Sequence, residues 1–243
     1  MSWLLIDNSN TRTKLTLGDA GGLDEWRSVI DTQELSVDSF NEALSGLDYD
    51  FVVICSVVPA KRELMERYFA QTRRHFVDQL SPIGMAIDYP EPAAIGADRL
   101  ANAAGVLEHH GSPVIVVDFG TAVTFDVISG QPAYCGGVIA PGLGAMSGYL
   151  AQKTALLEAI ELEEPSKAIG KSTRQAMLSG AVYGYRGLVR EIIARVKSEL
   201  DGEVKVVATG GDAELIASGV QEIDEVDRNL TLEGLRLIAS RLV

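Results

Sequence analysis

The sequence predicts an α/β fold in which one unit of strands and helices occurs twice. Short apolar strands alternate with helical segments along the chain. A strand that ends in aspartate, a short polar turn and a return strand occur at Asp7–Leu17 and again at Asp118–Ile128. Two similar hairpins in one protein are not unusual, so the spacing alone leaves duplication as a hypothesis. The hypothesis places a boundary near Gly111–Pro113 and predicts domains of residues 1–112 and 113–243.

The expected elements of the first half follow from short apolar runs and period-two alternation. The run "DYDFVVICSVVP" (Asp48–Pro59) is too short for a helix and is bounded by acids and a proline, which indicates a strand buried on both faces. The other expected elements are strands at Trp3–Asp7, Arg12–Gly18 and Glu25–Ile30, and helices at Ser36–Leu44 and Ala60–Ala70.

A long loop is expected at Ser81–Arg99, because its three prolines and two glycines exclude a regular helix. Loops of this length in compact domains are usually functional. The remaining expected elements are a helix at Leu100–His110, two strands within Val114–Ile128 joined at Asp118–Thr121, a helix at Thr173–Leu200, a strand at Glu203–Gly211 and a C-terminal helix from about Thr231.

The charge and composition exclude several classes of protein. The formal net charge of −13 disfavours a surface that binds nucleic acid, which needs clustered basic residues. No segment has the roughly 20 apolar residues of a membrane span, and Asp7 interrupts the first apolar run too early for a signal peptide. Cys55 and Cys135 lack a CxxC spacing and are expected to be buried thiols. We therefore expect a cytoplasmic protein without nucleic acid or membrane partners.

Each predicted hairpin turn begins with an acid at the end of an apolar strand. A carboxylate in this position loses hydration, so it needs a cation, a basic side chain or backbone N–H groups as a partner. Small polar residues follow Asp7 and Asp118, and such residues let backbone N–H groups approach a phosphate closely. The same residue types also form ordinary turns. Because the pattern occurs in both halves, phosphate binding is the favoured interpretation.

Two further segments contain candidate site residues. Asp98 and Arg99 follow Gly96 where the long loop meets a helix, and they are either a helix cap with an ion pair or a general base beside an anion-binding arginine. The strand that ends in "TGGD" (Thr209–Asp212) has glycines that suit the close approach of a nucleotide, although a lone pair of glycines is a weak signal.

These motifs together carry a resemblance to a known family. In chain order they are "IDNSNTRTK", "SVVP", "YPEPAAIGADR", "VVDFGTAVTFD", "GGVIAPG", "GKSTRQAMLSG" and "ATGGDA". The series is similar to that of type III pantothenate kinases and spans Ile6 to about Ala213. The resemblance implies two duplicated RNase-H-like domains of the actin, Hsp70 and sugar kinase superfamily with an interdomain cleft. It also implies phosphorylation of the terminal hydroxyl of pantothenate by ATP, as the first step of coenzyme A synthesis.

The resemblance implies that both hairpin turns bind the nucleotide and its ions. The cofactors it implies are ATP, Mg²⁺ or a similar divalent cation, and a monovalent cation, K⁺ or NH₄⁺. Asp118 is expected to hold the monovalent cation and Thr121 a nucleotide phosphate. The first phosphate loop is expected to consist of Asp7, Asn8, Ser9, Asn10, Thr11, Arg12, Thr13 and Lys14, with Asp7 positioning the metal-bound phosphates.

The same resemblance implies a substrate site and a homodimer. Asp98 is expected to be the general base on the pantothenate hydroxyl, and Thr173 to reach the substrate from the neighbouring subunit. The expected lining of the substrate pocket is Tyr89, Gly96, Ala97, Asp98 and Arg99.

Ser9 departs from the family pattern, which is Asp-x-Gly-Asn-Thr in the first loop. A serine disfavours positive φ, so either the loop avoids that conformation or it approaches the phosphate less closely. Two other functions stay open. Some relatives were described as accessory factors that raise the expression of virulence genes, so the chain is alternatively a regulatory protein with little or no catalysis. The other alternative is a kinase of the same superfamily that acts on a sugar or a short acid.

Overall fold

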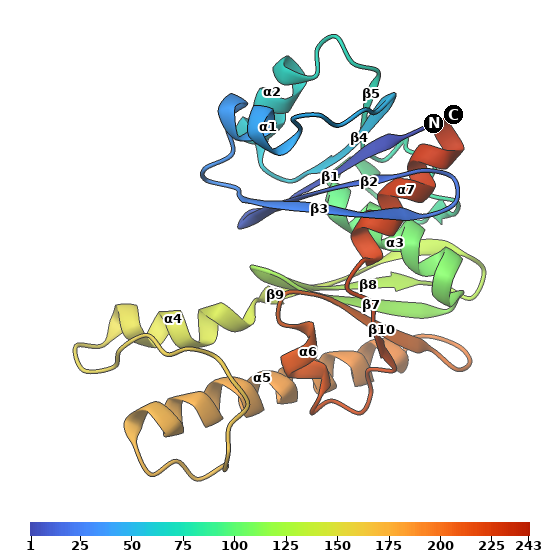
Figure 1. The fold of residues 1–243 in the computed structure, drawn as a ribbon. Helices are drawn as coiled ribbons and strands as arrows, with labels where there is room; N and C mark the ends of the chain where they lie inside the picture. The colour runs from blue at the N-terminus through green and yellow to red at the C-terminus, as the bar shows by residue number, and fades with distance from the viewer. The chain divides into compact units, whose positions relative to one another are not determined.

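The computed structural model describes residues 1–243 apart from the side chain of Ser147, and the chain forms two compact units (Figure 1). Unit 1 consists of residues 1–111 and 229–243, and unit 2 of residues 112–228. The predicted second domain of residues 113–243 differs from unit 2 at its C-terminal end. The reason is that the last helix packs against the first part of the chain, as described below.

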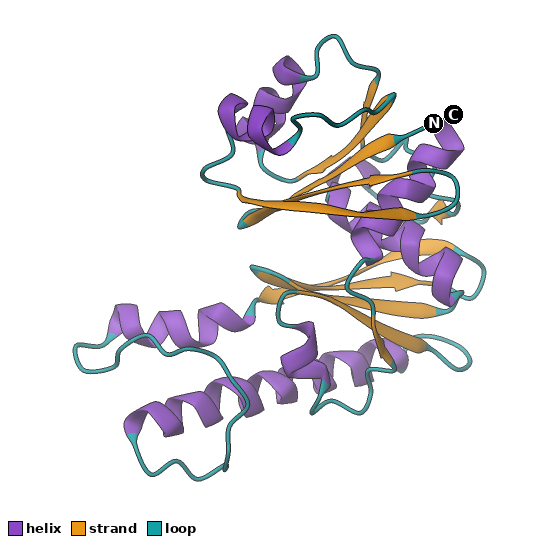
Figure 2. Ribbon diagram, in the orientation of Figure 1, coloured by secondary structure: helices purple, strands orange, loops and turns teal.

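Unit 1 is built on a sheet with helices on both faces (Figure 2). The strand order is β3-β2-β1-β4-β5. The pairs β3–β2 and β2–β1 are antiparallel, and the pairs β1–β4 and β4–β5 are parallel. The strands are β1 (Trp3–Asn8), β2 (Arg12–Gly18), β3 (Leu23–Asp31), β4 (Phe51–Ser56) and β5 (Arg74–Phe76).

The helices α1 (Val37–Ala43) and α2 (Pro59–Tyr68) cover one face of this sheet. Ser36 begins α1 with a capping box, in which Ser39 N donates to Ser36 Oγ at 3.2 Å and Ser36 N donates to Ser39 Oγ at 2.9 Å. Pro59 occupies the first turn of α2, where a missing N–H costs nothing. Leu4, Ile6 and Val52 pack with side chains of these helices in one apolar cluster.

The opposite face of the sheet carries α3 (Ala97–His110) and α7 (Leu230–Leu242), which lie side by side (Figure 1). A short strand β6 (Ala86–Ile87) and a 3₁₀ turn (Pro92–Ala94) precede α3. The expected long loop is thus interrupted, and α3 begins at Ala97 rather than at the expected Leu100. Asp98 and Arg99 consequently lie within the first turn of a helix.

Unit 2 repeats the arrangement of unit 1. The strands follow the order β11-β10-β7-β8-β9, in which β7, β8 and β9 are antiparallel and β10 and β11 continue in parallel with β7. This order matches β5-β4-β1-β2-β3, so the predicted duplication is confirmed. The strands are β7 (Val114–Phe119), β8 (Ala122–Ile128), β9 (Ala133–Pro141), β10 (Lys205–Gly210) and β11 (Glu225–Val226).

Three helices complete unit 2: α4 (Leu143–Lys153), α5 (Thr173–Lys197) and α6 (Ala213–Ala217). The apolar side of α5, including Val182, Tyr185 and Val189, packs on β7, β8 and β10. The helix α4 lies in a glycine-containing segment for which the sequence predicted no helix.

Two expectations from composition can be compared with the structure. Among the described residues, none of the helices combines the length and apolar character needed to cross a membrane. Cys55 is buried as expected, but Cys135 is exposed on β9, because its side chain points away from the core in the alternating pattern of that strand.

Candidate active site

The carboxylate of Asp7 lies at the end of β1, and its side chain is only 4% exposed. Lys14 is the residue opposite Asp7 in the β1–β2 register, and its Nζ lies 3.6 Å from Asp7 Oδ2. Ser9 Oγ donates a hydrogen bond of 3.0 Å to Asp7 Oδ1. Each carboxylate oxygen therefore has a polar partner, as a buried anion requires.

Asn8 points to the opposite face of the strand and is fully buried. Its Nδ2 donates to Thr13 Oγ1 at 2.7 Å, and its Oδ1 accepts from Ser56 Oγ at 2.7 Å. Thr13 is also fully buried and shares a 3.0 Å hydrogen bond with Thr32. Asn8 thus links β2 and β4 across β1. Of the eight residues expected in the first phosphate loop, Asn8 and Thr13 therefore have internal partners that hold the hairpin together.

The turn itself exposes its remaining side chains. Ser9 N donates to Arg12 O at 3.1 Å and closes a four-residue turn, in which Asn10, Thr11 and Arg12 are exposed. Among the described residues, only glycines have a positive φ. Ser9 therefore does not adopt the conformation that favours glycine, and its position in the family pattern does not impose backbone strain here.

Asp98 and Arg99 lie in the first turn of α3, next to the N-cap residue Gly96. Asp98 Oδ1 accepts a hydrogen bond of 2.8 Å from Arg99 N. A Cβ atom at position 96 would lie 2.5 Å from Asp98 Oδ1, so the carboxylate occupies the space that only glycine leaves open. The positive end of the helix dipole also favours an anion at this position. The chain thus fixes a carboxylate at the start of the helix. Tyr89 lies in the preceding segment, and Ala97 is buried.

In unit 2, two glycines bring backbone segments close to the turn after Asp118. Gly210 has φ +97°, and a Cβ there would lie 2.5 Å from Phe119 O and 2.7 Å from Asp118 Oδ1. A Cβ on Gly142 would lie 2.3 Å from Gly120 O, and Gly142 N donates to Thr121 O at 3.1 Å. The "TGGD" strand β10 thus adjoins this turn, and Thr121 is exposed.

Tyr185 supports the same turn and was not anticipated from the sequence. Its ring packs against Phe119, and its hydroxyl donates to Pro141 O at 3.3 Å. Burial, together with the negative charge of Asp212, raises the pKa of Tyr185, so the hydroxyl stays a donor. Its place in a helix-period apolar stripe with Val182 and Val189 was the available signal.

Thr173 is the first residue of α5, and its side chain is exposed. The helix begins after Ser172, whose Oγ accepts from Gln175 N at 3.2 Å. Thr173 belongs to unit 2, whereas Tyr89 and Gly96–Arg99 belong to unit 1.

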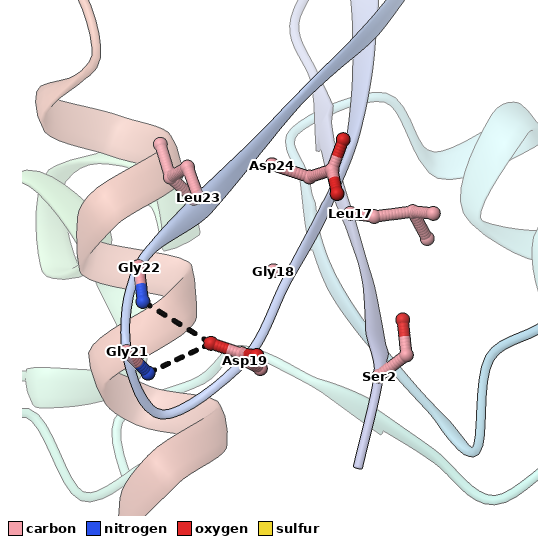
Figure 3. A pocket seen from close by; sticks show the side chains of 8 residues that line it. All are labelled: Ser2, Leu17, Gly18, Asp19, Gly21, Gly22, Leu23 and Asp24. Carbon is pink, nitrogen blue, oxygen red and sulfur yellow. Dashed lines mark hydrogen bonds between the residues drawn. The ribbon is translucent and has the colours of Figure 1, made fainter.

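The pocket drawn in Figure 3 lies at the opposite end of the β1–β2 hairpin from Asp7, near the register pair Trp3 and Gly18. Asp19 Oδ1 points back into its own turn there and accepts from Gly21 N at 2.7 Å and Gly22 N at 3.2 Å (Figure 3). This carboxylate therefore stabilises the β2–β3 turn by accepting hydrogen bonds from its backbone. The pocket contains none of the predicted site residues.

Comparisons with known proteins identify the family. The sequence model of type III pantothenate kinases matches residues 3–195. The chain belongs to the type III pantothenate kinase family. Type III pantothenate kinases from Akkermansia muciniphila and Methylacidiphilum infernorum are 55% and 43% identical to it, over 98% and 99% of this chain and 98% and 89% of theirs.

Solved structures with low sequence identity share the fold of this family member. A Campylobacter jejuni protein assigned to the Baf family of transcriptional activators has a TM-score of 0.66 at 19% identity and covers 98% of each chain. The polyphosphate/ATP-glucomannokinase from Arthrobacter has a TM-score of 0.51 at 15% identity and covers 99% of each chain. These similarities confirm the predicted fold of the actin, Hsp70 and sugar kinase superfamily.

The two asparagines of the first turn give a direct test of its internal and exposed residues. We expect Asn8→Ala to lower the free energy of unfolding by about 2–4 kcal/mol, because the hydroxyls of Thr13 and Ser56 lose a buried partner. Asn10→Ala, at an exposed position, should change it by less than about 0.5 kcal/mol. Urea denaturation of both variants measures the difference, and equal stabilities would contradict the assignment.

Proposed function

We propose that this chain transfers the γ-phosphoryl group of ATP to the terminal hydroxyl of pantothenate and forms 4′-phosphopantothenate. The proposal is carried by one observation: a match to type III pantothenate kinases over nearly the whole chain that includes the Gly96–Arg99 segment at the start of α3. In the type III pantothenate kinase family, this reaction is the first step of coenzyme A synthesis.

Asp98 is the proposed general base. Its carboxylate accepts the hydroxyl proton of pantothenate while the hydroxyl oxygen attacks the γ-phosphorus and the bond to ADP breaks. Little basicity is needed, because positioning and charge stabilisation dominate phosphoryl transfer. The position of the Asp98 carboxylate, in the space left open by Gly96, supports this role.

Arg99 is proposed to pair with the carboxylate of pantothenate, since a guanidinium matches that group in shape and charge. Tyr89 is proposed to line the pocket.

The first turn is proposed to bind the phosphates of ATP through its exposed residues. Lys14, Asn10 and Thr11 supply donors, whereas Asn8 and Thr13 keep the turn in place from inside the hairpin. The described residues contain no cluster of three or more His, Cys, Asp or Glu side chains that could form a metal site. Mg²⁺ is commonly bound by one or two carboxylates together with substrate phosphates. Asp7 is the residue that would hold it, and the ion would neutralise phosphate charge.

The second turn is proposed to bind a monovalent cation and a phosphate. Asp118 supplies a carboxylate at the end of β7. Gly210 lets the backbone of β10 approach this carboxylate, and Gly142 lies close to the backbone of Gly120 and Thr121. A carboxylate and backbone carbonyls are suitable oxygen ligands for K⁺ or NH₄⁺. The exposed hydroxyl of Thr121 is the proposed phosphate contact.

A homodimer is proposed from the exposed apolar side chains of unit 2. Ile139 on β9 and Tyr149 on α4 are each 62% exposed, and Leu156 and Ile169, in the segment between α4 and α5, are 90% and 76% exposed. These side chains lie on α4 or on segments next to it in the sequence, and a large exposed apolar patch usually marks a protein interface. The exposed N-terminus of α5 adjoins this segment, which supports the proposal that Thr173 reaches the substrate of the other subunit.

Replacement of the proposed base gives the main test of this mechanism. Asp98→Asn should fold normally and lose about 10²- to 10⁴-fold in kcat with ATP and pantothenate, because the amide cannot accept the proton. Asp38→Asn, an exposed acid in the first turn of α1, is the matched control and should keep its activity. An Asp98→Asn enzyme with more than about a tenth of the wild-type rate would exclude Asp98 as the base.

The cation role of Asp118 predicts a specific loss of salt dependence. The wild-type rate should rise with added KCl relative to NaCl at constant ionic strength. Asp118→Asn should remove most of that response, since an amide binds a cation more weakly than a carboxylate does. Initial rates over a KCl series measure the effect, and an unchanged response to K⁺ in the variant would reject this assignment.

The proposed dimer can be tested by adding one charge. Tyr149→Glu should convert the dimer to a monomer in light scattering, because a carboxylate would be buried without a partner. Leu80→Glu is the matched control, since Leu80 is an 83% exposed apolar residue of unit 1. A monomeric wild-type protein, or a dimer that survives Tyr149→Glu, would count against this surface.

A further inference from the structure

The helix that carries Asp98 is attached to the C-terminal helix α7 one turn behind the carboxylate. Asn102 follows Asp98 by four residues on α3, and its side chain is fully buried. Thr231, in the first turn of α7, donates from Oγ1 to Asn102 Oδ1 at 2.7 Å. The two residues are 129 positions apart in the sequence. The contact therefore joins the C-terminal helix to the middle of the chain, one helical turn behind Asp98.

Two glycines let the backbones of α3 and α7 touch. A Cβ on Gly234 of α7 would lie 1.8 Å from Ala101 O, and a Cβ on Gly105 of α3 would lie 2.6 Å from Leu230 O. The contact is reciprocal, because Gly105 follows Ala101 by four residues and Gly234 follows Leu230 by four. Glycine inside a helix is about 1 kcal/mol less favourable than alanine. Close packing between the helices, rather than backbone freedom, explains both glycines.

The helix α7 is also fixed to parts of unit 1 other than α3. Arg236, which is 9% exposed, donates to Asp19 O at 3.4 Å and to Ala20 O at 3.3 Å. Near the end of the helix, Arg241 donates to Pro82 O at 3.2 Å. These contacts reach the β2–β3 turn and the segment that precedes α3. The helix therefore provides α3 with a support that is anchored independently.

We propose that α7 positions the catalytic end of α3, with Thr231 and Asn102 acting as positioning residues for Asp98. The glycine contacts set the distance between the helices, and the Thr231–Asn102 hydrogen bond resists sliding of α3 along its axis. A displacement of about 1 Å at a reacting group can reduce a rate about 10²-fold, so small movements of this turn matter. The inference rests on the proposed role of Asp98 in pantothenate phosphorylation.

The test removes the Thr231 hydroxyl in the full-length protein. Thr231→Val should reduce kcat about tenfold while the KM for ATP stays within about twofold, because the nucleotide turn is untouched. Thr231→Ser keeps the hydroxyl and should restore kcat to within about twofold of wild type. The matched control is Thr16→Val in β2, a fully buried threonine that donates to Trp26 O at 2.9 Å. This control should lower the melting temperature without lowering kcat.

Hydrogen exchange provides a readout that does not depend on catalysis. Thr231→Val should speed amide exchange at Ala97–Leu100 in the substrate-free protein, and Thr16→Val should not. If Thr231→Val does not fold, Thr231→Ala serves in its place. An unchanged kcat and unchanged exchange at this turn, or an equal loss of kcat in Thr16→Val, would overturn the inference. A wild-type protein that does not phosphorylate pantothenate would instead contradict the proposed function, and the exchange measurement would still decide the role of α7.

Discussion

The buried negative charge of Asp7 is the constraint that shapes the first hairpin of this protein. A carboxylate with a side chain only 4% exposed is tolerated when its oxygens have polar or charged partners. Lys14 and Ser9 provide these partners from the facing strand and the adjoining turn. Because side chains alternate along a strand, Asn8 must then face the other side, where it is buried between Thr13 and Ser56. The long polar run thus divides into residues that hold the hairpin and residues that remain exposed at its tip.

The turn after Asp118 in the second unit is packed in a different way. Its hairpin has the same strand order, but the turn after Asp118 is surrounded by backbone that glycines at 142 and 210 allow to approach. In the first unit, side chains of the hairpin hydrogen-bond to one another, and in the second, glycines also let neighbouring backbone segments approach the turn. This difference agrees with separate proposed tasks, phosphates and a divalent ion for the first turn and a monovalent cation for the second. The two units thus share one strand order but differ in how their hairpin turns are packed.

Local sequence patterns predicted the central strands, because these are continuous apolar runs bounded by acids, glycine or proline, but β5, β6, β9 and β11 were not predicted. The hairpin acids, the start of α1 at its Ser36 cap and the duplication could all be inferred in this way. The start of α3 was missed by three residues, since the glycine and prolines before it indicate a loop until Gly96 is seen to act as a cap. The position of α7 in unit 1 was not predictable. It depends on contacts such as Thr231–Asn102 that no local pattern records.

The structure was also needed to show which of the predicted site residues are buried inside the hairpin and which are exposed. Asn8 and Asn10 have the same residue type and lie two positions apart, yet one is buried in the hairpin and the other is exposed. Ser9 departs from the family pattern, but its φ is not positive and its hydroxyl contacts Asp7. The residue that seemed to conflict with the site is therefore one of the partners that its carboxylate needs.

The central claim is that this framework phosphorylates pantothenate, and product analysis tests it most directly. The purified protein can be incubated with ATP, MgCl₂ and KCl and, in separate reactions, with pantothenate, a hexose, glycerate or acetate. Mass spectrometry then identifies the phosphorylated product. We predict 4′-phosphopantothenate, with ADP formed in equal amount and little turnover of the other acceptors. Absence of that product, or faster phosphorylation of another acceptor, would contradict the account.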